Sequence, residues 1–407
     1  MKKIELLAPA GDMSKLKTAF YFGADAAYLG GRNFSLRANA GNFSDDEMAY
    51  AVNYAHNLGK KIYVTVNILA RNYDLAAAEE YFKFLRKIKA DGVIISDTGL
   101  IALCRKVSPD LSIHLSTQAS ALNYATVKFW KDTGLKRVIL ARELSLKEIA
   151  EIHKEVPDIE LESFVHGAMC ISYSGRCLLS DYRTGRSSNR GECVQACRWN
   201  YEIRERGSDG AFMTVEEDGR GTYILNSKDL NLIEYIKELD DAGVNSFKIE
   251  GRMKSEYYIA TVVNAYRRAI DDYYKNGENY KLNPLYNAEL EKTAHREFTT
   301  AYFLGENDRT ENFSDSQSAG THKFIAYVID YNEKEGYALT EMRNRFKKGD
   351  VLEVLSPSDS FNKTVTADKI LTENGEETED VKTVQQKVKL FTDVKLSAGD
   401  ILRIKAQ

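Results

Sequence analysis

The sequence has 407 residues, a length typical of two or three domains. Hydrophobic residues make up 43% and charged residues 29%, which excludes a mainly disordered chain, and only five prolines are present, which excludes long proline-rich linkers. The net charge of −4 excludes a globally basic coat for nucleic acid but leaves room for a local basic patch.

Membrane insertion is not expected. No apolar run reaches the roughly 18 residues that a membrane-spanning helix needs. The apolar stretch Ile4–Ala10 is short and contains Glu5, so it predicts a first strand rather than a signal peptide. We therefore expect a cytoplasmic protein with no membrane partner, whose cysteines stay reduced.

The first part of the chain alternates short apolar strands with amphipathic helices. Ser44–Glu47 and Ser145–Glu148 have the pattern of capping boxes, which begin helices. Glycines at the expected helix ends predict left-handed turns. They are Gly23, Gly59, Gly92, Gly134 and Gly243. Eight strands are predicted in this part: Ile4–Ala8, Ala26–Leu29, Ile62–Val66, Gly92–Ser96, Leu111–Ser116, Arg137–Ala141, Glu160–Val165 and Asn245–Glu250.

Eight strands alternating with helices predict a closed (β/α)₈ barrel over residues 1–277. The seventh and eighth strands begin about 85 residues apart, whereas the earlier ones begin about 26 apart, so residues 166–229 are expected to be an insertion. The seventh helix should follow at Leu230–Asp241. Residues 278–320 indicate a connecting segment and linker, and the apolar–polar alternation of residues 321–407 predicts a small all-β, barrel-like domain.

Four of the five cysteines lie in the predicted insertion: Cys170, Cys177, Cys193 and Cys197. Four thiolates gathered in a reducing compartment most often hold a metal. Structural zinc usually takes tighter paired spacings, so the spacing favours an iron–sulfur cluster, with zinc as the alternative occupant and buried free thiols as a third interpretation. Cys104 lies on an apolar helix stripe and is expected in the core.

The same insertion is rich in arginine and aromatic residues. Arginine pairs with phosphate through two parallel hydrogen bonds, and aromatic rings stack on bases, so we interpret this segment as an RNA surface. Solvated arginines paired with nearby acids, or a site for a small anion, are the alternatives. The residues are Arg176, Arg183, Arg186, Arg190, Arg198, Arg204 and Arg206, with Tyr173, Tyr182, Trp199 and Tyr201 between them.

Polar residues follow most of the predicted strands. In such barrels the loops after the strands form the active-site face, so these residues are candidates for binding or catalysis. Asp97 also suits a helix cap before Thr98, and His166, just before the first cysteine, suits proton transfer. The candidates are Asn67, Asp97, Gln118, Arg142, Glu143, His166, Glu250 and Arg252.

Residues Glu162 to Ser180 read E-S-F-V-H-G-A-M-C-I-S-Y-S-G-R-C-L-L-S and match the whole signature of the collagenase-like peptidase family U32. The resemblance continues through Leu7–Gly11, Tyr28–Arg32, Ser116–Gln118 and Lys248–Arg252. The chain is most similar to the family's tRNA hydroxylation proteins. This resemblance implies a [4Fe–4S] cluster on the four cysteines of the insertion, and 5-hydroxyuridine formation at the wobble position of tRNA without O₂, with prephenate as the apparent hydroxyl donor.

The resemblance leaves other activities open. Some members are described as collagenases, and others act on rRNA or on quinone. The sequence contains neither H-E-x-x-H nor G-x-S-x-G, so two common protease sites are absent. Some relatives act as pairs, which makes a paralogous partner subunit a further expectation.

Strands six and eight flank strand seven in a closed barrel. We therefore expect Arg142, Glu143, His166, Glu250 and Arg252 to line one pocket beside the cluster. Arg142 and Arg252 would together suit a dicarboxylate such as prephenate, which needs paired cations. Salt bridges that close the barrel rim are the alternative role for these residues.

Overall fold

A computed structural model describes residues 3–36, 41–170, 172–173, 176–199, 227–305 and 319–406. The chain forms two compact units. The first contains residues 1–16, 25–253 and 296–318, and the second contains residues 17–24, 254–295 and 319–407. Residues 254–277, which the sequence analysis assigned to the barrel, thus group with the C-terminal domain. Within the described ranges no helix is long and apolar enough to cross a membrane.

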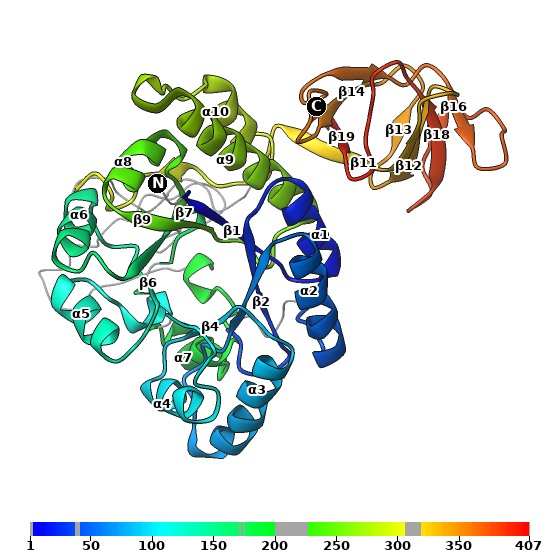
Figure 1. The fold of residues 1–407 in the computed structure, drawn as a ribbon. Coiled ribbons are helices and arrows are strands. Elements are labelled where there is room, and N and C mark those ends of the chain that lie inside the picture. Colours follow the sequence, from blue (N-terminus) through cyan, green and yellow to red (C-terminus); the bar gives the residue numbers. More distant parts are fainter. Residues whose placement is uncertain are drawn as a thin grey trace, which may run out of the picture. The chain divides into compact units, whose positions relative to one another are not determined.

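The first unit contains a closed barrel of eight parallel strands (Figure 1). Each strand pairs with the next along the chain, and β9 pairs with both β7 and β1, which closes the barrel. The predicted (β/α)₈ fold is therefore confirmed. The strands are β1 (Glu5–Pro9), β2 (Ala26–Gly30), β3 (Lys61–Thr65), β4 (Gly92–Ile95), β5 (Ile113–Leu115), β6 (Arg137–Ile139), β7 (Glu160–Ala168) and β9 (Val244–Ile249).

The intervening helices begin largely where the sequence predicts. Both capping boxes form, at Ser44 with Glu47 and at Ser145 with Glu148. The helices of this part of the chain are α1 (Met13–Tyr21), α2 (Asp45–Asn57), α3 (Leu75–Lys87), α4 (Thr98–Val107), α5 (Tyr124–Asp132), α6 (Leu146–Glu155) and α8 (Ile236–Asp241).

Four of the five predicted helix-ending glycines have positive φ; Gly92 does not. Gly92 is the first residue of β4, where its missing side chain leaves room for Tyr63 and His114. The left-handed position after α3 is taken by Lys89, with φ 60°.

The start of the predicted seventh helix is wrong. Asp229–Asn231 forms a short strand, β8, which runs antiparallel to the end of β7 and parallel to β10 (Phe298–Thr299). The helical part begins only with a 3₁₀ turn at Ile233–Tyr235, followed by α8. Pairing with segments distant in the chain overrides local helix propensity here.

The barrel interior holds an ionic network in place of the branched aliphatic layers usual in this fold. Glu162 is fully buried and accepts hydrogen bonds from Lys248 at 2.7 Å and Arg137 at 3.1 Å. Arg137 also pairs with Glu5 and with the partly exposed Glu160. Burial is compensated by these pairings, since isolated buried charges are very costly.

His114 of β5 lies in the same interior, with its ring 4.6 Å from that of Tyr63. Burial and the positive charges of Arg137 and Lys248 hold the pKa of His114 well below its ordinary 6.5. The unfolded chain therefore takes up this proton first as the pH falls.

We expect this histidine to destabilise the fold in acid. His114 should not affect the free energy of unfolding above pH 6.5, where it is neutral in both states. Below pH 6.5 it should lower the free energy of unfolding by up to about 1.4 kcal/mol per pH unit, because the unfolded chain binds the proton more readily. In His114→Phe that part of the pH dependence should disappear. Urea unfolding of both proteins between pH 5 and 8 measures it, and parallel pH profiles would contradict the prediction.

The second unit contains α9 (Glu256–Asn276), α10 (Pro284–Leu290) and the C-terminal β domain (Figure 1). The predicted all-β character of this domain is confirmed. Seven antiparallel strands share one apolar core, in the order β15-β14-β19-β11-β12-β18-β16. They are β11 (His322–Asn332), β12 (Tyr337–Met342), β14 (Val351–Leu355), β15 (Thr364–Thr366), β16 (Ile370–Thr372), β18 (Lys387–Phe391) and β19 (Ile401–Lys405), with β13 (Phe346–Lys347) and β17 (Asp380–Val381) forming a separate pair.

A buried ion pair ties the helices of this unit to its β domain. Arg403 of β19 and Glu289 of α10 are both fully buried and form two hydrogen bonds with each other. Lys292 and Glu353 extend the pair into a balanced group of four charges. Helices and sheet of this unit are therefore held together by more than apolar packing.

Candidate functional site

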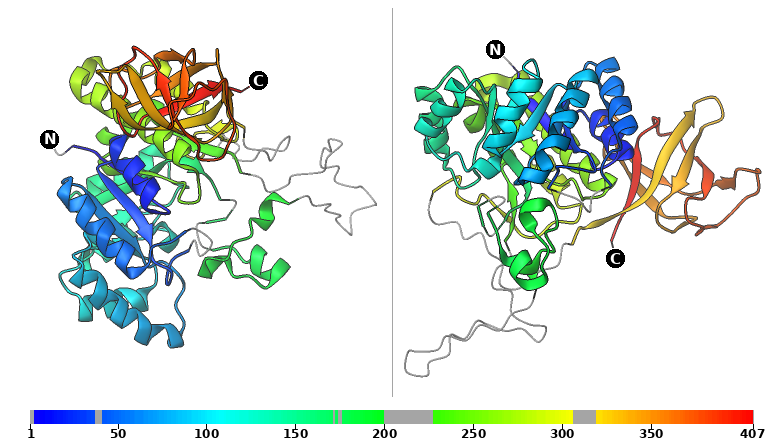
Figure 2. Two further views of the ribbon diagram at one scale, coloured as in Figure 1. Left: turned by 90° about the vertical axis from the view of Figure 1, so that its right-hand side faces the viewer. Right: turned by 90° about the horizontal axis from the view of Figure 1, so that it is seen from below.

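The cysteine-rich segment lies over one end of the barrel. It carries α7 (Leu179–Thr184), which Figure 1 shows across the barrel opening and Figure 2 shows beyond one end of the strands. Arg176 donates to the carbonyl of Gln118 after β5 at 3.3 Å, and Leu69 after β3 donates to the carbonyl of Asn189 at 3.2 Å. The segment therefore covers the C-terminal face, where barrel enzymes place their chemistry.

The four clustered cysteines converge. Burial raises the pKa of the Cys197 thiol, and the charges of Cys170, Cys193 and Cys177 raise it further, against the opposing effect of Arg198. Three donors already point at sulfur. The Cys177 Sγ accepts from the backbone of Leu179 at 3.4 Å, and the Cys193 Sγ accepts from Ser180 at 3.7 Å and Gln195 at 3.4 Å.

Four thiols are a donor set of the kind that holds an iron–sulfur cluster or zinc. Among the described residues, no three histidine, cysteine or acidic side chains are arranged to hold a single metal ion. A [4Fe–4S] cube accepts its thiolates farther apart than one tetrahedral zinc does, and donors to sulfur are one means of tuning it. Cys104, by contrast, is buried in α4, as predicted.

A buried arginine–aspartate pair adjoins this segment, and the sequence analysis did not predict it. Arg296 donates to Asp229 through its backbone at 3.2 Å and its Nε at 3.0 Å, and both side chains are buried. Arg198 lies close enough for its pKa to be affected by Arg296, Cys197, Asp229 and Cys170, in addition to its burial. Only the fold reveals this pair, because Asp229 and Arg296 are far apart in the chain.

Arg142 and Glu250 meet at the barrel mouth. Arg142 Nη2 lies 3.2 Å from the Glu250 carboxylate, and Nη1 donates to the carbonyl of Ala168 at 2.7 Å. The guanidinium also stacks 3.9 Å from the ring centroid of Phe164. Burial raises the pKa of the neighbouring Glu143. The expected meeting of strand ends six and eight across strand seven is thus seen for Arg142 and Glu250.

His166 lies inside β7, which continues to Ala168 instead of ending at Val165. Its side chain is buried, and its ring centroid is 5.5 Å from that of Phe298. Longer pairing with β8 and β9 extends the strand. His166 is therefore enclosed by neighbouring strands near the mouth.

Arg252 takes a different side of the mouth from Arg142. It is buried and donates to the hydroxyl of Thr65 in β3 at 2.8 Å, beside Gly30 of β2. Asn67 accepts from the backbone of Leu36 at 3.2 Å. Arg142 is therefore bound to Ala168 and Glu250, whereas Nη1 of Arg252 is bound to β3, and their joint binding of a dicarboxylate stays a prediction.

Asp97 and Gln118 follow β4 and β5. The Asp97 carboxylate accepts from the backbone of Leu100 at 3.0 Å, which confirms the predicted cap of α4. Gln118 is 4% exposed and faces the mouth beneath Arg176.

The arginines of the segment fall into two groups. Arg183 and Arg186 are exposed, close to Tyr182, whose side chain is 86% exposed. Arg190 instead forms two hydrogen bonds with Asp74, at 2.9 and 3.2 Å, and a third with the carbonyl of Leu69. Arg190 therefore pairs with an acid, the alternative role expected for the arginines of this segment. Arg204, Arg206, Tyr201 and most of the 307–320 linker lie outside the described residues.

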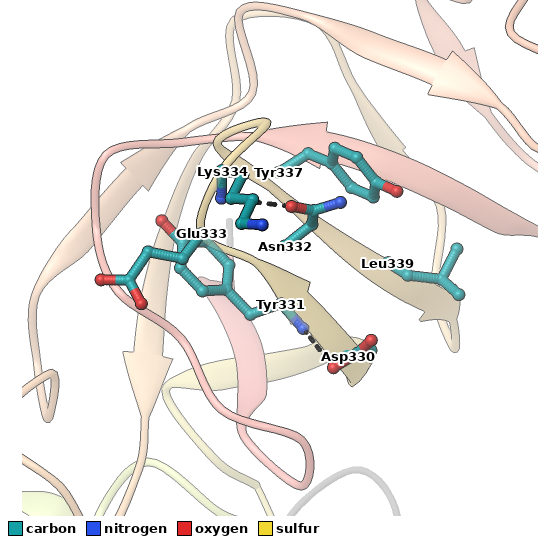
Figure 3. A pocket seen from close by; sticks show the side chains of 7 residues that line it. All are labelled: Asp330, Tyr331, Asn332, Glu333, Lys334, Tyr337 and Leu339. Carbon is teal, nitrogen blue, oxygen red and sulfur yellow. Dashed lines mark hydrogen bonds between the residues drawn. The ribbon is translucent and has the colours of Figure 1, made fainter.

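The C-terminal domain has a hollow of about 560 Å³ along the β11–β12 hairpin (Figure 3). Its polar groups bond mainly within the hairpin. Asn332 accepts from the backbone of Lys334 at 3.1 Å, and Asp330 accepts from that of Tyr331 at 2.9 Å. These bonds shape a turn, so the hollow is not a strong candidate for chemistry.

The fold and the mouth define a class: a (β/α)₈-barrel protein with a four-cysteine segment over its C-terminal face. The family model described as "Peptidase family U32" matches residues 11–312, and "Peptidase family U32 C-terminal domain" matches residues 320–403. The chain therefore belongs to peptidase family U32, as its signature predicted.

Relatives cover nearly the whole chain. "tRNA hydroxylation protein P1" of Bacillus subtilis is 44% identical over 99% of this chain and 95% of its own length. "tRNA hydroxylation protein P" of Escherichia coli is 40% identical, covering 90% and 89%. A more distant relative, "Collagenase" of Porphyromonas gingivalis, is 29% identical, covering 87% of each chain.

Proposed function

We propose that this protein hydroxylates the wobble uridine of tRNA to 5-hydroxyuridine without O₂, with prephenate as the apparent hydroxyl donor. The observation that carries the proposal is the 44% identity, over almost the full length of both chains, to a protein named for tRNA hydroxylation. The exposed aromatic and basic residues beside the barrel mouth support it. The protein would act in the cytoplasm, and a paralogous partner subunit stays a prediction.

We propose a [4Fe–4S] cluster held by Cys170, Cys177, Cys193 and Cys197, with zinc as the alternative occupant. Such a cluster would supply a Lewis-acidic or electron-transfer centre next to the mouth. The chain's own residues would bind and orient the substrates there. Arg142 is held by Ala168, Glu250 and Phe164, and we propose that His166, four residues before Cys170, would hold or move a proton.

The test is genetic and chemical. In a bacterium that lacks its own tRNA uridine hydroxylation genes, expression of this chain should restore 5-hydroxyuridine or its derivatives in digested tRNA, measured by mass spectrometry. Restoration should fail when prephenate synthesis is blocked. Restored hydroxylation of rRNA or of quinone, with unmodified tRNA, would instead favour one of those substrates.

The runner-up function is proteolysis, which the family name and the Porphyromonas relative suggest. Gelatin degradation by the purified protein, abolished by point changes at the mouth, would favour it. The absence of H-E-x-x-H and G-x-S-x-G from the sequence argues against the two commonest protease arrangements.

Arg183→Ala combined with Arg186→Ala should weaken tRNA binding and make it less sensitive to salt. Every phosphate that the variant no longer neutralises should reduce the slope of log K against log salt by about 0.7–0.9. Filter binding at several salt concentrations measures this slope.

Arg190→Ala is the matched control, because this arginine is bound to Asp74. It should leave the salt slope near that of the wild type. If the slope of log K against log salt is unchanged in the Arg183/Arg186 variant, these arginines do not contact phosphates and are solvated loop residues.

A further inference from the structure

Three buried hydrogen-bond donors at the barrel mouth have no partner among the described residues. They are the hydroxyl of Ser96, the side-chain nitrogen of Gln118 and Nε of Arg142. These residues follow β4, β5 and β6, three adjacent strands. Buried donors are seldom left without a partner, so three of them after adjacent strands point to a ligand at this part of the mouth.

The strand register directs Ser96 and the neighbour of Gln118, Ser116, to the barrel interior. Ile94 pairs with His114, whose ring lies in the barrel interior against Tyr63. Side chains alternate along a strand, so Ser96 and Ser116 share that inward direction. Ser116 in turn contacts Gln118, at 3.3 Å from Oγ to Oε1.

The hydrogen bonds already made leave mainly donors for a ligand. Ser116 donates to the amide oxygen of Gln118, so the amide nitrogen is the group left over. Each Nη atom of Arg142 already donates one hydrogen bond, to Ala168 or to Glu250, whereas its buried Nε–H donates none. Gln118 and Arg142 therefore require acceptors from a ligand, and the Ser96 hydroxyl can also donate.

The charge balance distinguishes between two kinds of acceptor. Among these three residues, the one formal charge is that of Arg142, and Glu250 compensates it at 3.2 Å. A dicarboxylate prefers paired cations, and these three residues include one arginine, while Nη1 of Arg252 donates to Thr65 of β3. A neutral ring with carbonyl oxygens suits this donor set better.

We propose that Ser96, Gln118 and Arg142 form a subsite for the carbonyl oxygens of the target uracil, turned out of the RNA strand. The inference rests on the proposed function and adds to it the residues that read the base. Uracil has an acceptor at O4 where cytosine has an amino donor. The Gln118 nitrogen and the Arg142 Nε can only donate, so they favour uracil, and a site built for a hydrogen bond rejects a base that cannot make it.

The test uses the full chain and free nucleotides, so that it does not depend on turnover. Binding of uridine and cytidine 5′-monophosphate is measured by ligand-observed NMR on the wild type, Gln118→Met and Ser96→Ala. We expect the wild type to prefer the uridine nucleotide by about tenfold, and Gln118→Met to lose most of that preference. Ser112→Ala, at the opposite end of β5, is the matched serine control and should bind as the wild type does.

Prephenate binding to the same proteins separates the two candidate ligands. Prephenate affinity should change little in Gln118→Met and Ser96→Ala. If these variants weaken prephenate binding and leave the uridine nucleotide unaffected, the subsite belongs to the small acid and the proposal is overturned. Equal binding of both nucleotides by the wild type would also overturn it.

The cellular readout keeps this inference distinct from the proposed function. In the complemented strain, Gln118→Met with Ser96→Ala should lower 5-hydroxyuridine at least tenfold, at unchanged tRNA affinity and iron content. Wild-type levels in this variant would overturn the subsite alone. Nucleotide selectivity as expected, in a wild type that fails to hydroxylate tRNA, would support the subsite and reject the proposed function.

Discussion

Replacing Cys177 or Cys193 by serine is expected to remove the iron of anaerobically purified protein and to abolish tRNA hydroxylation. The wild type should contain about four iron atoms per chain and absorb broadly in the violet, as expected for a [4Fe–4S] cluster. A serine hydroxyl is a poor substitute for thiolate as a ligand of iron in such a cluster. Iron analysis and absorption spectroscopy, with 5-hydroxyuridine content in the complemented strain, measure the effect.

Cys104→Ala is the matched control for this experiment. Cys104 is a buried thiol of α4 outside the cysteine-rich segment, so its loss should leave iron content unchanged. Stoichiometric zinc without iron in the anaerobic wild type would reject the iron–sulfur proposal. Zinc in an aerobic sample would not, because exposed clusters decay in air and zinc can occupy their thiolates.

Glu162→Ala is expected to destabilise the barrel by about 3–5 kcal/mol, because it leaves Lys248 and Arg137 buried without their shared carboxylate. Glu162 lies on β7, which is flanked by β6 and β9, and its side chain is fully buried. Urea unfolding monitored by circular dichroism measures the loss. If Glu162→Ala gives no soluble protein, that result agrees with a loss of stability. The thermal unfolding of Glu162→Gln, a milder substitution, then measures the loss.

Glu160→Ala provides the comparison within the same strand. Glu160 pairs with the same Arg137, but a third of its side chain is exposed, so its loss should cost about 1 kcal/mol or less. If both substitutions lowered the free energy of unfolding equally, the buried ion pairs of the barrel interior would not stabilise the fold more than the partly exposed pair does. The two residues share strand, residue type and the partner Arg137, and they differ in burial and in the second partner of Glu162, Lys248.

Local patterns in the sequence were sufficient to predict the eight barrel strands and the starts of two helices. Alternation of apolar strands with capped helices predicts eight strands, and all eight are present in the closed barrel. Both capping boxes form because their hydrogen bonds join residues three apart. The U32 signature likewise lies in one continuous stretch, Glu162 to Ser180, and the family models confirm it.

Where a partner is distant in the chain, the sequence alone was not enough. The left-handed turn expected at Gly92 lies at Lys89, although Gly92 begins β4 as predicted, and Asp229–Asn231 was expected to lead into a helix but pairs with β7. Arg190 resembles its exposed neighbours in sequence, yet it binds Asp74, 116 residues away. Each outcome depends on contacts that local propensity does not encode.

At the barrel mouth, the features that the sequence predicts are most clearly distinct from those that only the tertiary structure decides. From the sequence, polar residues after strands could be predicted as candidates, because strand ends of a barrel share one face. Only the tertiary structure pairs Arg142 with Glu250, sends Arg252 towards Thr65 and leaves donors on Ser96, Gln118 and Arg142. The physical reason is that residue type and strand order determine which groups reach the mouth, whereas hydrogen-bond partners depend on distances between strands that meet only when the barrel closes.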